Sequence, residues 1–364
     1  MTSVLWIAPN FNHYKVCFLK KLAQRGLDIH VIAGTASPNL GHVPTSHDVE
    51  ELPVTRVEVE AAKFQNVWRI YTTLWHLIGT KKPQVVLIPC EKKYLAVIVY
   101  LALLRRTRRQ YAFVTYTHPI MRSRGSRWKG VNKWITRAMF GTFDRVIFYT
   151  QNAMREALQL RLLGRNKAAF ANNTLDTEAI DKVYSYTPPP ATPRLLFIGR
   201  LVPSKRIDLL LEYYKKLRHK FSDISLNIIG DGPEAHLVQA AMQVSPEIIW
   251  SGPLSVEAEI ADHMRQAQLV FLPGRSGLAV VHAFCYGRPF ATLSADDHGP
   301  EAAYLRDDWN GLYLSGDIDN DVSRLYQLLS SRDRLMQLSQ NAYQTSKQLA
   351  IGHWCDQMET ALEI

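Results

Sequence analysis

The chain has 364 residues, of which 47% are hydrophobic and 21% charged, a composition typical of a soluble globular protein. Its length is too great for one ordinary core and fits two domains of average size. The net charge of +10 belongs to the first half, because residues 1–186 hold 27 Lys and Arg against 12 Asp and Glu, whereas residues 187–364 hold 16 against 21. This imbalance indicates that one lobe meets an anionic partner.

The chain carries no pattern of a secreted or membrane-spanning protein. The four cysteines are isolated, which predicts reduced thiols in a cytosolic protein. The first residues lack the basic region, long apolar core and cleavage site of a secretion signal. The longest apolar run, residues 94–104, is about half of what a membrane span needs. We therefore expect any membrane contact to be peripheral.

The first half alternates strand and helix patterns. An apolar strand is followed by a turn, a helix at about residues 14–24 that Gly26 closes, and a second strand. Such an alternation is typical of a doubly wound parallel sheet. The expected strands are 4–8, 28–33, 85–89, 111–117 and 145–149.

The segment 185–194, SYTPPPATPR, marks the domain boundary, since four prolines in ten residues remove backbone donors and fix φ. The boundary separates an N-terminal lobe, 1–186, from a C-terminal lobe, 187–349. A C-terminal helix at about 350–364 can cross back to the first lobe. The second lobe repeats the pattern, with strands expected at 195–198, 225–229, 248–250, 269–272, 290–293 and 311–313, and helices from about 205 and at 234–243, 256–266 and 278–286. The fold class is therefore α/β, with two Rossmann-like lobes whose carboxyl strand ends face a central cleft.

Two places in the second lobe are candidate anion sites. The loop Gly-Arg-Ser-Gly at 274–277 lies between a strand and a helix whose first amides would face a ligand; an empty tight turn is the alternative. Ser204 is expected to cap another helix and to place Lys205 and Arg206 in its first turn, where the helix dipole disfavours cations. A bound phosphate would resolve that conflict, unless both side chains point into solvent.

A resemblance to a known family follows from motifs in order along the chain. FIGRLVPSKRIDLLLEYYKKL, LNIIGDGPEAHLVQAA, LVFLPGRSGLAVVHAFCYGRPF and HGPEAAYLRDDWNGLYL resemble the C-terminal lobe of GT-B glycosyltransferases of family 4, also called glycosyl transferases group 1. In the first half, THPIMRS, FDRVIFYTQNAMREAL and NNTLDTEAID are more loosely similar. The resemblance implies a nucleotide-sugar donor on the C-terminal lobe, an acceptor on the N-terminal lobe, and transfer with retention of the anomeric configuration.

The resemblance also implies roles for individual residues. Arg200 and Lys205 would hold the donor diphosphate, with Gly199 allowing close backbone approach. The sugar and β-phosphate would lie against the loop of Gly274, Arg275, Ser276, Gly277 and Leu278. Gly230 could lie near the nucleotide, or its turn could be a plain loop. His118 would lie beside the transferred sugar, although a His before Pro is often only a turn residue. The expected catalytic residues are thus His118, Arg200 and Lys205.

The chain departs from the family pattern at two glutamates, which are Gly274 and His282 here. A neutral imidazole at His282 can accept one hydrogen bond from a ribose hydroxyl, without the strength of a charged acceptor; alternatively it is a helix residue with no ligand. Our hypothesis is that Glu301 supplies a missing carboxylate. On the acceptor side we expect Asn10, Phe11, Asn12, His13 and Glu91.

The basic first half predicts a surface that faces an anionic membrane. Cations interleaved with tryptophan are typical of membrane-surface segments. Nucleic acid would suit the charge, but no nucleic-acid-binding motif accompanies it; a solvated surface without a partner is the other alternative. The expected membrane-facing residues are Arg105, Arg106, Arg108, Arg109, Arg124, Arg127, Trp128, Lys129 and Trp134.

The sequence thus predicts a retaining, hexosyl-type glycosyltransferase that needs neither metal nor cofactor. Its partners would be a nucleotide-sugar donor, a lipid-linked or glycan acceptor and an anionic membrane, and not nucleic acid. It would act in lipopolysaccharide or exopolysaccharide assembly, in the cytoplasm on the inner face of the cell membrane. The alternatives are a GT-B nucleotide-sugar epimerase, and a non-catalytic basic module with a degenerate donor site.

Overall fold

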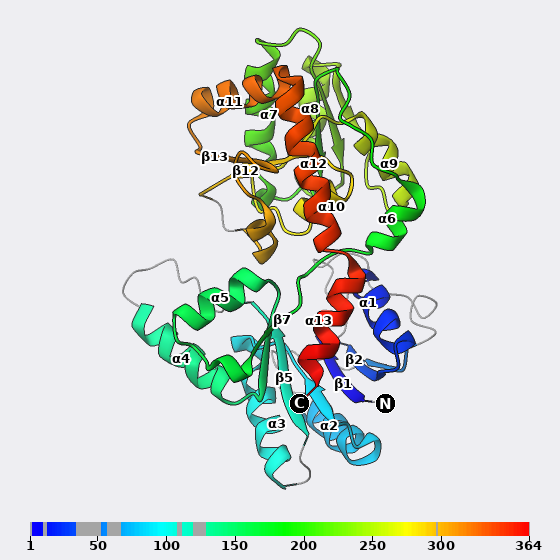
Figure 1. The fold of residues 1–364 in the computed structure, drawn as a ribbon, viewed down its shortest axis with the longest axis vertical. Helices are drawn as coiled ribbons and strands as arrows, with labels where there is room; N and C mark the ends of the chain where they lie inside the picture. The colour runs from blue at the N-terminus through cyan, green and yellow to red at the C-terminus, as the bar shows by residue number, and fades with distance from the viewer. Residues whose placement is uncertain are drawn as a thin grey trace. The chain divides into compact units, whose positions relative to one another are not determined.

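The computed structural model describes residues 2–9, 13–33, 52–56, 67–107, 111–118, 129–295 and 298–363. The chain divides into two compact units, residues 1–172 with 352–364, and residues 173–351. Each unit contains one parallel sheet with helices, drawn in Figure 1. The predicted α/β class with two doubly wound lobes is confirmed.

The first unit is built on a seven-stranded sheet of order β3-β2-β1-β4-β5-β6-β7, in which every pair of neighbours is parallel. Its strands are β1 (Ser3–Ala8), β2 (Asp28–Ala33), β3 (Val54–Arg56), β4 (Val85–Leu87), β5 (Ala112–Thr117), β6 (Arg145–Phe148) and β7 (Ala168–Phe170). Its helices are α1 (His13–Gln24), α2 (Val67–Lys81), α3 (Leu95–Thr107), α4 (Lys129–Gly141), α5 (Gln151–Gln159) and nearly all of α13 (Ile351–Leu362), with the short 3₁₀ turns η2 (Lys92–Tyr94) and η4 (Arg165–Lys167).

Helices cover both faces of this sheet. Buried side chains of α2, α3, α4 and α5 share one core with Leu5 and Phe113 of the sheet, so these four helices form one layer. Tyr116 has the opposite parity to Phe113 in β5 and therefore points to the other face. There the indole of Trp354 in α13 donates a hydrogen bond of 3.1 Å to the Tyr116 hydroxyl and packs edge-on against Phe18 of α1. Figure 1 shows α13 in red beside α1 in blue.

The second unit is built on a six-stranded sheet of order β10-β9-β8-β11-β12-β13, again parallel throughout. Its strands are β8 (Arg194–Ile198), β9 (Ser225–Ile229), β10 (Ile248–Trp250), β11 (Leu269–Phe271), β12 (Phe290–Leu293) and β13 (Gly311–Leu314). Its helices are α6 (Thr177–Val183), α7 (Ile207–Arg218), α8 (Ala235–Val244), α9 (Glu257–Gln266), α10 (Ala279–Cys285), α11 (Ile318–Ser330) and α12 (Arg332–Gln348), with the 3₁₀ turns η5 (Pro203–Lys205) and η6 (Pro300–Tyr304).

The change from one unit to the other falls between Asn172 and Asn173, whereas the sequence prediction placed it between residues 186 and 187. The segment before the prolines belongs to the second unit because α6 packs against α9. The Tyr184 hydroxyl also donates a hydrogen bond of 3.0 Å to the carbonyl oxygen of Tyr286. These contacts are tertiary, and the proline-rich composition of the connection does not reveal them.

One predicted helix start is wrong. Lys205 and Arg206 do not lie in the first turn of α7: Lys205 ends the 3₁₀ turn η5, Arg206 is left-handed with φ of 57°, and α7 begins at Ile207. The N-cap position of α7 is Arg206 rather than Ser204, and no side chain caps the helix there. The carbonyl groups of Ser204 and Lys205 instead accept hydrogen bonds from Arg275 (2.8 Å) and Gly274 (3.2 Å), so contact with another loop overrides the local helix signal.

Candidate functional site

The carboxyl edge of the second sheet gathers most of the residues that the sequence predicts to bind the donor. Gly199 and Arg200 follow β8, Gly230 follows β9, and the loop 272–278 follows β11. The strands β8 and β11 are neighbours although two strands separate them in the sequence, so the strand order reverses between them. Ligands of open α/β sheets bind at such a switch point. The fold therefore places Gly199, Arg200 and the loop 274–278 on the two sides of a candidate binding site.

Glycine is required at Gly230 and Gly274 because other backbone comes too close for a side chain. A Cβ atom on Gly230 would lie 1.8 Å from the carbonyl oxygen of Gly199, and the φ of Gly230 is +139°. A Cβ atom on Gly274 would lie 2.4 Å from the carbonyl oxygen of Ser204 and 2.6 Å from the carbonyl carbon of Lys205. A glutamate at position 274 would thus clash with the backbone of η5, against which this loop packs.

Lys205 joins the two sides of the candidate site. Its ammonium donates hydrogen bonds to the backbone carbonyl oxygens of Arg275 and, at 3.5 Å, Ser276. Burial and, to a smaller extent, the charges of Arg200 and Arg275 lower the pKa of Lys205 to about 8, against the opposing effect of Glu301. Three cations thus act on one another at this edge, and a bound anion would stabilise all of them.

The short helix α10 contributes less to an anion site than the sequence suggests. It begins at Ala279 and has seven residues. The backbone amide of Ser276 donates a hydrogen bond of 3.3 Å to Nδ1 of His298, whose Nε2 donates one of 2.5 Å to the carbonyl oxygen of Leu293. The cations at this edge, rather than the amide of Ser276, therefore carry the argument for an anion.

Glu301 lies in η6 and is buried, with Oε1 accepting a hydrogen bond of 2.6 Å from the Asn173 side chain. Burial raises the pKa of Glu301, while the hydrogen bond from Asn173, that from its own backbone and the charge of Lys205 act in the opposite direction. The carboxyl group is thus within electrostatic reach of Lys205, as the hypothesis of a replacement carboxylate requires. Contact of Glu301 with a donor stays a prediction.

His282 has a carboxylate partner that the sequence analysis missed. Its Nε2 donates a hydrogen bond of 2.7 Å to Oε1 of Glu257, which also accepts one of 2.6 Å from the Tyr286 hydroxyl. Both the His282 and the Glu257 side chains are largely buried. Burial acts to raise the pKa of Glu257, but the hydrogen bonds from His282 and Tyr286 outweigh it and the pKa is lowered. Glu257 opens α9, and no spacing in the sequence relates it to His282.

Two expected residues of the first unit share the carboxyl edge of its sheet. Glu91 follows β4, and His118 follows β5 and packs on the ring of Tyr149, with 4.4 Å between ring centroids. The hydroxyl of Thr117 donates a hydrogen bond of 3.3 Å to the carbonyl oxygen of Cys90, which ties the two strand ends together. Asn10, Phe11 and Asn12 lie outside the described residues, and of His13 only the backbone, at the start of α1, is described.

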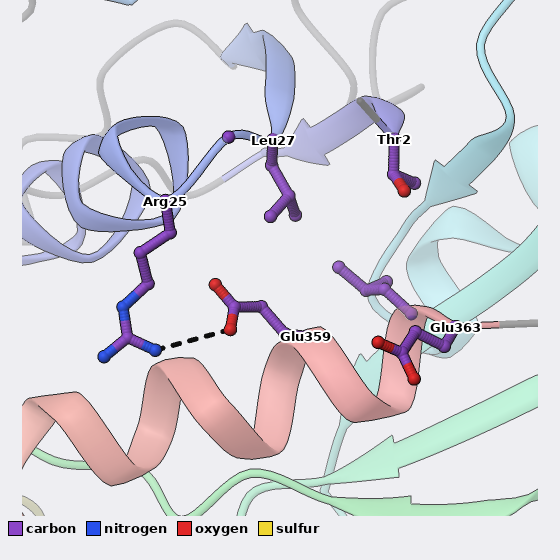
Figure 2. Close-up of a pocket in the computed structure, with 7 residues that line it drawn as sticks. Thr2, Arg25, Leu27, Glu359 and Glu363 are labelled. Atoms are coloured by element: carbon purple, nitrogen blue, oxygen red, sulfur yellow. Dashed lines mark hydrogen bonds and ion pairs between the residues drawn. The ribbon is translucent and has the colours of Figure 1, made fainter.

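A cavity of about 580 Å³ in the first unit lies at the opposite edge of this sheet, because Thr2 and Leu27 directly precede β1 and β2. Figure 2 shows Arg25 reaching Glu359 of α13 across it. Arg25 also pairs with Asp356 at 2.6 Å. The ion pairs of Arg25 tie α13 to this edge of the unit, and the cavity is lined by none of the residues expected to bind an acceptor.

The expected membrane-facing residues are only partly described. Arg108, Arg109, Arg124, Arg127 and Trp128 lie outside the described residues, and the side chain of Lys129 is not described. Arg105 forms an ion pair of 2.8 Å with Asp144, Arg106 is exposed, and Trp134 is 71% exposed. Among the described helices none is long and apolar enough to cross a membrane. The residues that the structure describes contain no group of three or more His, Cys, Asp or Glu that could hold a metal ion. Two neighbouring aspartates, Asp296 and Asp297, lie outside the described residues.

Two family models match the chain, one in each half. The model described as Glycosyltransferase Family 4 matches residues 16–179, and the model described as Glycosyl transferases group 1 matches residues 192–331. The first model covers most of the first unit and the second covers the candidate site.

Curated relatives match over shorter stretches. An uncharacterized glycosyltransferase of Methanocaldococcus jannaschii is 25% identical over 43% of this chain and 43% of its own length. The lipopolysaccharide 1,2-N-acetylglucosaminetransferase of Salmonella typhimurium is 29% identical over 36% of this chain and 38% of its own length. The chain thus spans less than half the length of the curated relatives that it matches.

Solved structures match over the whole chain. A glycosyltransferase from Rickettsia africae aligns with a TM-score of 0.73 at 11% identity, covering 100% of this chain and 98% of its own. The Anabaena protein HepE in complex with UDP aligns with a TM-score of 0.71 at 13% identity, covering 100% and 99%. At these identities the likeness establishes the fold.

Proposed function

We propose, on the premise that the chain belongs to the GT-B glycosyltransferases and resembles their family 4, that it moves a hexose-type sugar from a nucleoside diphosphate to an acceptor hydroxyl with retention of configuration. The observation that carries the proposal is the position of Lys205. Its ammonium reaches the loop at 274–278 from η5, beside Arg200 and Arg275, at the point where the strand order reverses. A diphosphate is an anion that suits three cations in this arrangement.

The chemistry of the transfer follows from where charge develops. The bond between the anomeric carbon and the β-phosphate oxygen breaks, and the acceptor oxygen forms a bond to the same carbon from the same face. The acceptor proton passes to the departing phosphate. Arg200 and Lys205 stabilise the negative charge that appears on this leaving group, so neither a metal ion nor a cofactor enters the proposal.

The proposed acceptor is a glycan carried on a lipid, in assembly of a cell-surface polysaccharide. The basic first half and the partial likeness to a lipopolysaccharide transferase support this acceptor class. The protein would then act in the cytoplasm, bound peripherally to the inner face of the membrane. Glu91 and the segment 10–13 are the residues that we propose for the acceptor side, and His118 is the catalytic residue that we propose beside the transferred sugar.

Calorimetry with UDP, GDP, ADP and CDP tests the donor site directly. We expect one of these nucleotides to bind, and Lys205→Met to weaken its binding about ten- to a hundredfold, the effect of a lost hydrogen bond to a charged group. Arg206→Met is the matched control, because Arg206 is the next residue, is partly exposed and pairs with Asp208 instead. Absence of binding to all four nucleotides would favour a non-catalytic module with a degenerate donor site.

Product analysis separates transfer from epimerisation. With the matching nucleotide sugar and a lipid-linked acceptor, we expect release of the nucleoside diphosphate and a product with the anomeric configuration of the donor, which NMR reports. Formation of an epimeric nucleotide sugar without acceptor would instead establish the rival epimerase.

A further inference from the structure

The large exposed apolar side chains of the first unit gather on three neighbouring helices. Among its described residues eight large apolar side chains are exposed, and all but Leu160 belong to α2, α3 or α4. These helices lie in one layer on one face of the sheet. We define their apolar face by the seven exposed residues: Trp68, Trp75, Leu95, Val99, Leu103, Val131 and Trp134.

Helix α3 is apolar on both its sides. Its inner side buries Val97, Ile98, Leu101 and Leu104 in the core of the first unit. On its outer side Leu95, Val99 and Leu103 recur every four residues and are 47%, 48% and 56% exposed. A helix that is apolar all round is normally buried on all sides. The outer side of α3 therefore has the composition of a surface that an apolar partner covers.

Neighbouring helices extend the same face. Trp68 and Trp75 are two turns apart on α2, and Trp68 is 77% exposed. The helices α2 and α3 touch through Tyr71 and Tyr100, whose ring centroids are 4.6 Å apart. Indole rings with one exposed side are typical of the boundary between headgroups and acyl chains.

The segments that form the apolar face carry side-chain charge of one sign, although Lys93 and Arg105 pair with Glu91 (3.5 Å) and Asp144 (2.8 Å) just outside them. The segments α2, η2, α3 and α4 carry nine Lys and Arg, two in each of the first three and three in α4, and no Asp or Glu. Lys92 and Arg106, at the two ends of the outer stripe of α3, are exposed. A second copy of this chain would bring cations against cations, whereas anionic lipid headgroups complement them.

The apolar face begins at the edge of the sheet where the acceptor residues are expected. In a parallel α/β unit each helix runs back against its strands, so its first turn lies near their carboxyl ends. Trp68, Leu95 and Val131 all lie in the first turns of their helices. Only the 3₁₀ turn η2 separates Leu95 from Glu91 in the chain. A surface that meets lipid at this edge would bring a lipid-linked acceptor to Glu91 and His118.

We propose that the apolar face lies in the interface of an anionic lipid bilayer, with Leu95, Val99 and Leu103 of α3 among the acyl chains and Lys92 and Arg106 at the phosphates. This inference rests on the proposed membrane association but not on the chemistry of transfer.

Vesicle binding of the full chain tests the proposal. We expect the protein to sediment with vesicles of phosphatidylglycerol and phosphatidylethanolamine and not with phosphatidylcholine alone. Leu95→Ser combined with Leu103→Ser should weaken binding about tenfold or more, because two leucine side chains no longer leave water. Val244→Ser is the matched control, since Val244 is an 83% exposed apolar residue of the second unit. Its binding should equal that of the wild type.

Three further outcomes would overturn the proposal. Equal vesicle binding by the double variant would show attraction by charge alone. A dimer of the wild type in sedimentation velocity without vesicles, lost in the double variant, would make the apolar face an interface between copies. Quenching of tryptophan by brominated acyl chains that persists unchanged when Trp68, Trp75 and Trp134 are all replaced by Phe would place other residues in the lipid. Nucleotide binding by the double variant, measured in the same samples, tests the donor site separately from the membrane proposal.

Discussion

The imidazole Nε2 of His282 donates a hydrogen bond of 2.7 Å to the carboxylate of Glu257, which lies 25 residues earlier in the chain. The same oxygen of Glu257 accepts a hydrogen bond from the Tyr286 hydroxyl. The start of α9 and one side of α10 are thus joined through one carboxylate. Nε2 of His282 therefore carries a proton, because an ionised carboxylate oxygen can only accept a hydrogen bond.

Glu257→Ala should lower the free energy of unfolding at pH 7 by about 1–3 kcal/mol, since two donors lose a charged acceptor. The pKa of Glu257 is lowered in the folded protein, so its contribution is present above the ordinary value of 4.5 and is lost as the pH falls through the lowered value. The difference between variant and wild type in urea unfolding should therefore shrink below about pH 4. Glu259→Ala, an exposed carboxylate in the same turn, is the control. A difference that stays constant at acid pH would contradict the role of the charge.

Nucleotide affinity should depend on pH through Lys205. The pKa of this ammonium is lowered to about 8, so the charged form that a diphosphate needs declines above pH 8. We expect affinity to be constant between about pH 7 and 8, where the terminal phosphate is fully ionised, and to fall up to about tenfold per pH unit above pH 8. Calorimetry at pH 8 in buffers of different ionisation enthalpy should detect proton uptake on binding. Lys205→Arg removes the titration, because guanidinium stays charged, and a wild-type affinity that is flat up to pH 9.5 would contradict the assignment.

The lowered pKa of Lys205 also acts on stability without a ligand. The unfolded chain binds the proton more tightly than the folded protein, so the free energy of unfolding should rise between pH 8 and the ordinary value of 10.5. Lys205→Met should remove this rise, which a comparison of urea unfolding at pH 8 and pH 10.5 would measure.

Gly274→Ala should destabilise the second unit by about 1–3 kcal/mol. It should also weaken nucleotide binding at temperatures where the variant is still fully folded. The new methyl group would meet the backbone of Ser204 and Lys205, which cannot move without displacing η5. Gly130→Ala in α4 is the control, because open space surrounds its Cβ position. Thermal unfolding and calorimetry check both effects, and an alanine variant that binds nucleotide like the wild type would refute the docking of this loop.

Trp354→Ala should lower the stability of the first unit by about 3–5 kcal/mol. The indole is 3% exposed, packs against Phe18 at 4.7 Å between ring centroids and donates to Tyr116. Trp354→Phe should recover most of the packing without the hydrogen bond. Trp309→Ala, at a residue that is 38% exposed, should cost far less in the same thermal scans. Equal losses for Trp354 and Trp309 would mean that α13 does not hold the first unit together.

Local patterns in the sequence predicted most of the strands and helices. Apolar runs such as 28–33, 248–250 and 290–293 are strands with the predicted bounds. These patterns act within a few residues: alternation of apolar side chains, and glycine or proline at the ends. Local patterns also explain why the start of α7 was mispredicted. The hydrogen bond from the amide of Arg275 to the carbonyl oxygen of Ser204 joins residues far apart in the sequence, and no local pattern reports it.

Local sequence patterns were enough to predict the α/β class, the repeat of one sheet pattern on each side of a proline-rich connection, and the order of the loops that meet at the carboxyl edge. Which atoms meet at that edge depends on contacts between distant segments. Lys205 reaches a carbonyl 70 residues away, and His282 reaches Glu257 rather than solvent. The outer side of α3 is exposed although its residues are as apolar as a core helix. Burial and contact between distant segments depend on how helices pack on the sheets, and no spacing along the chain encodes that packing locally.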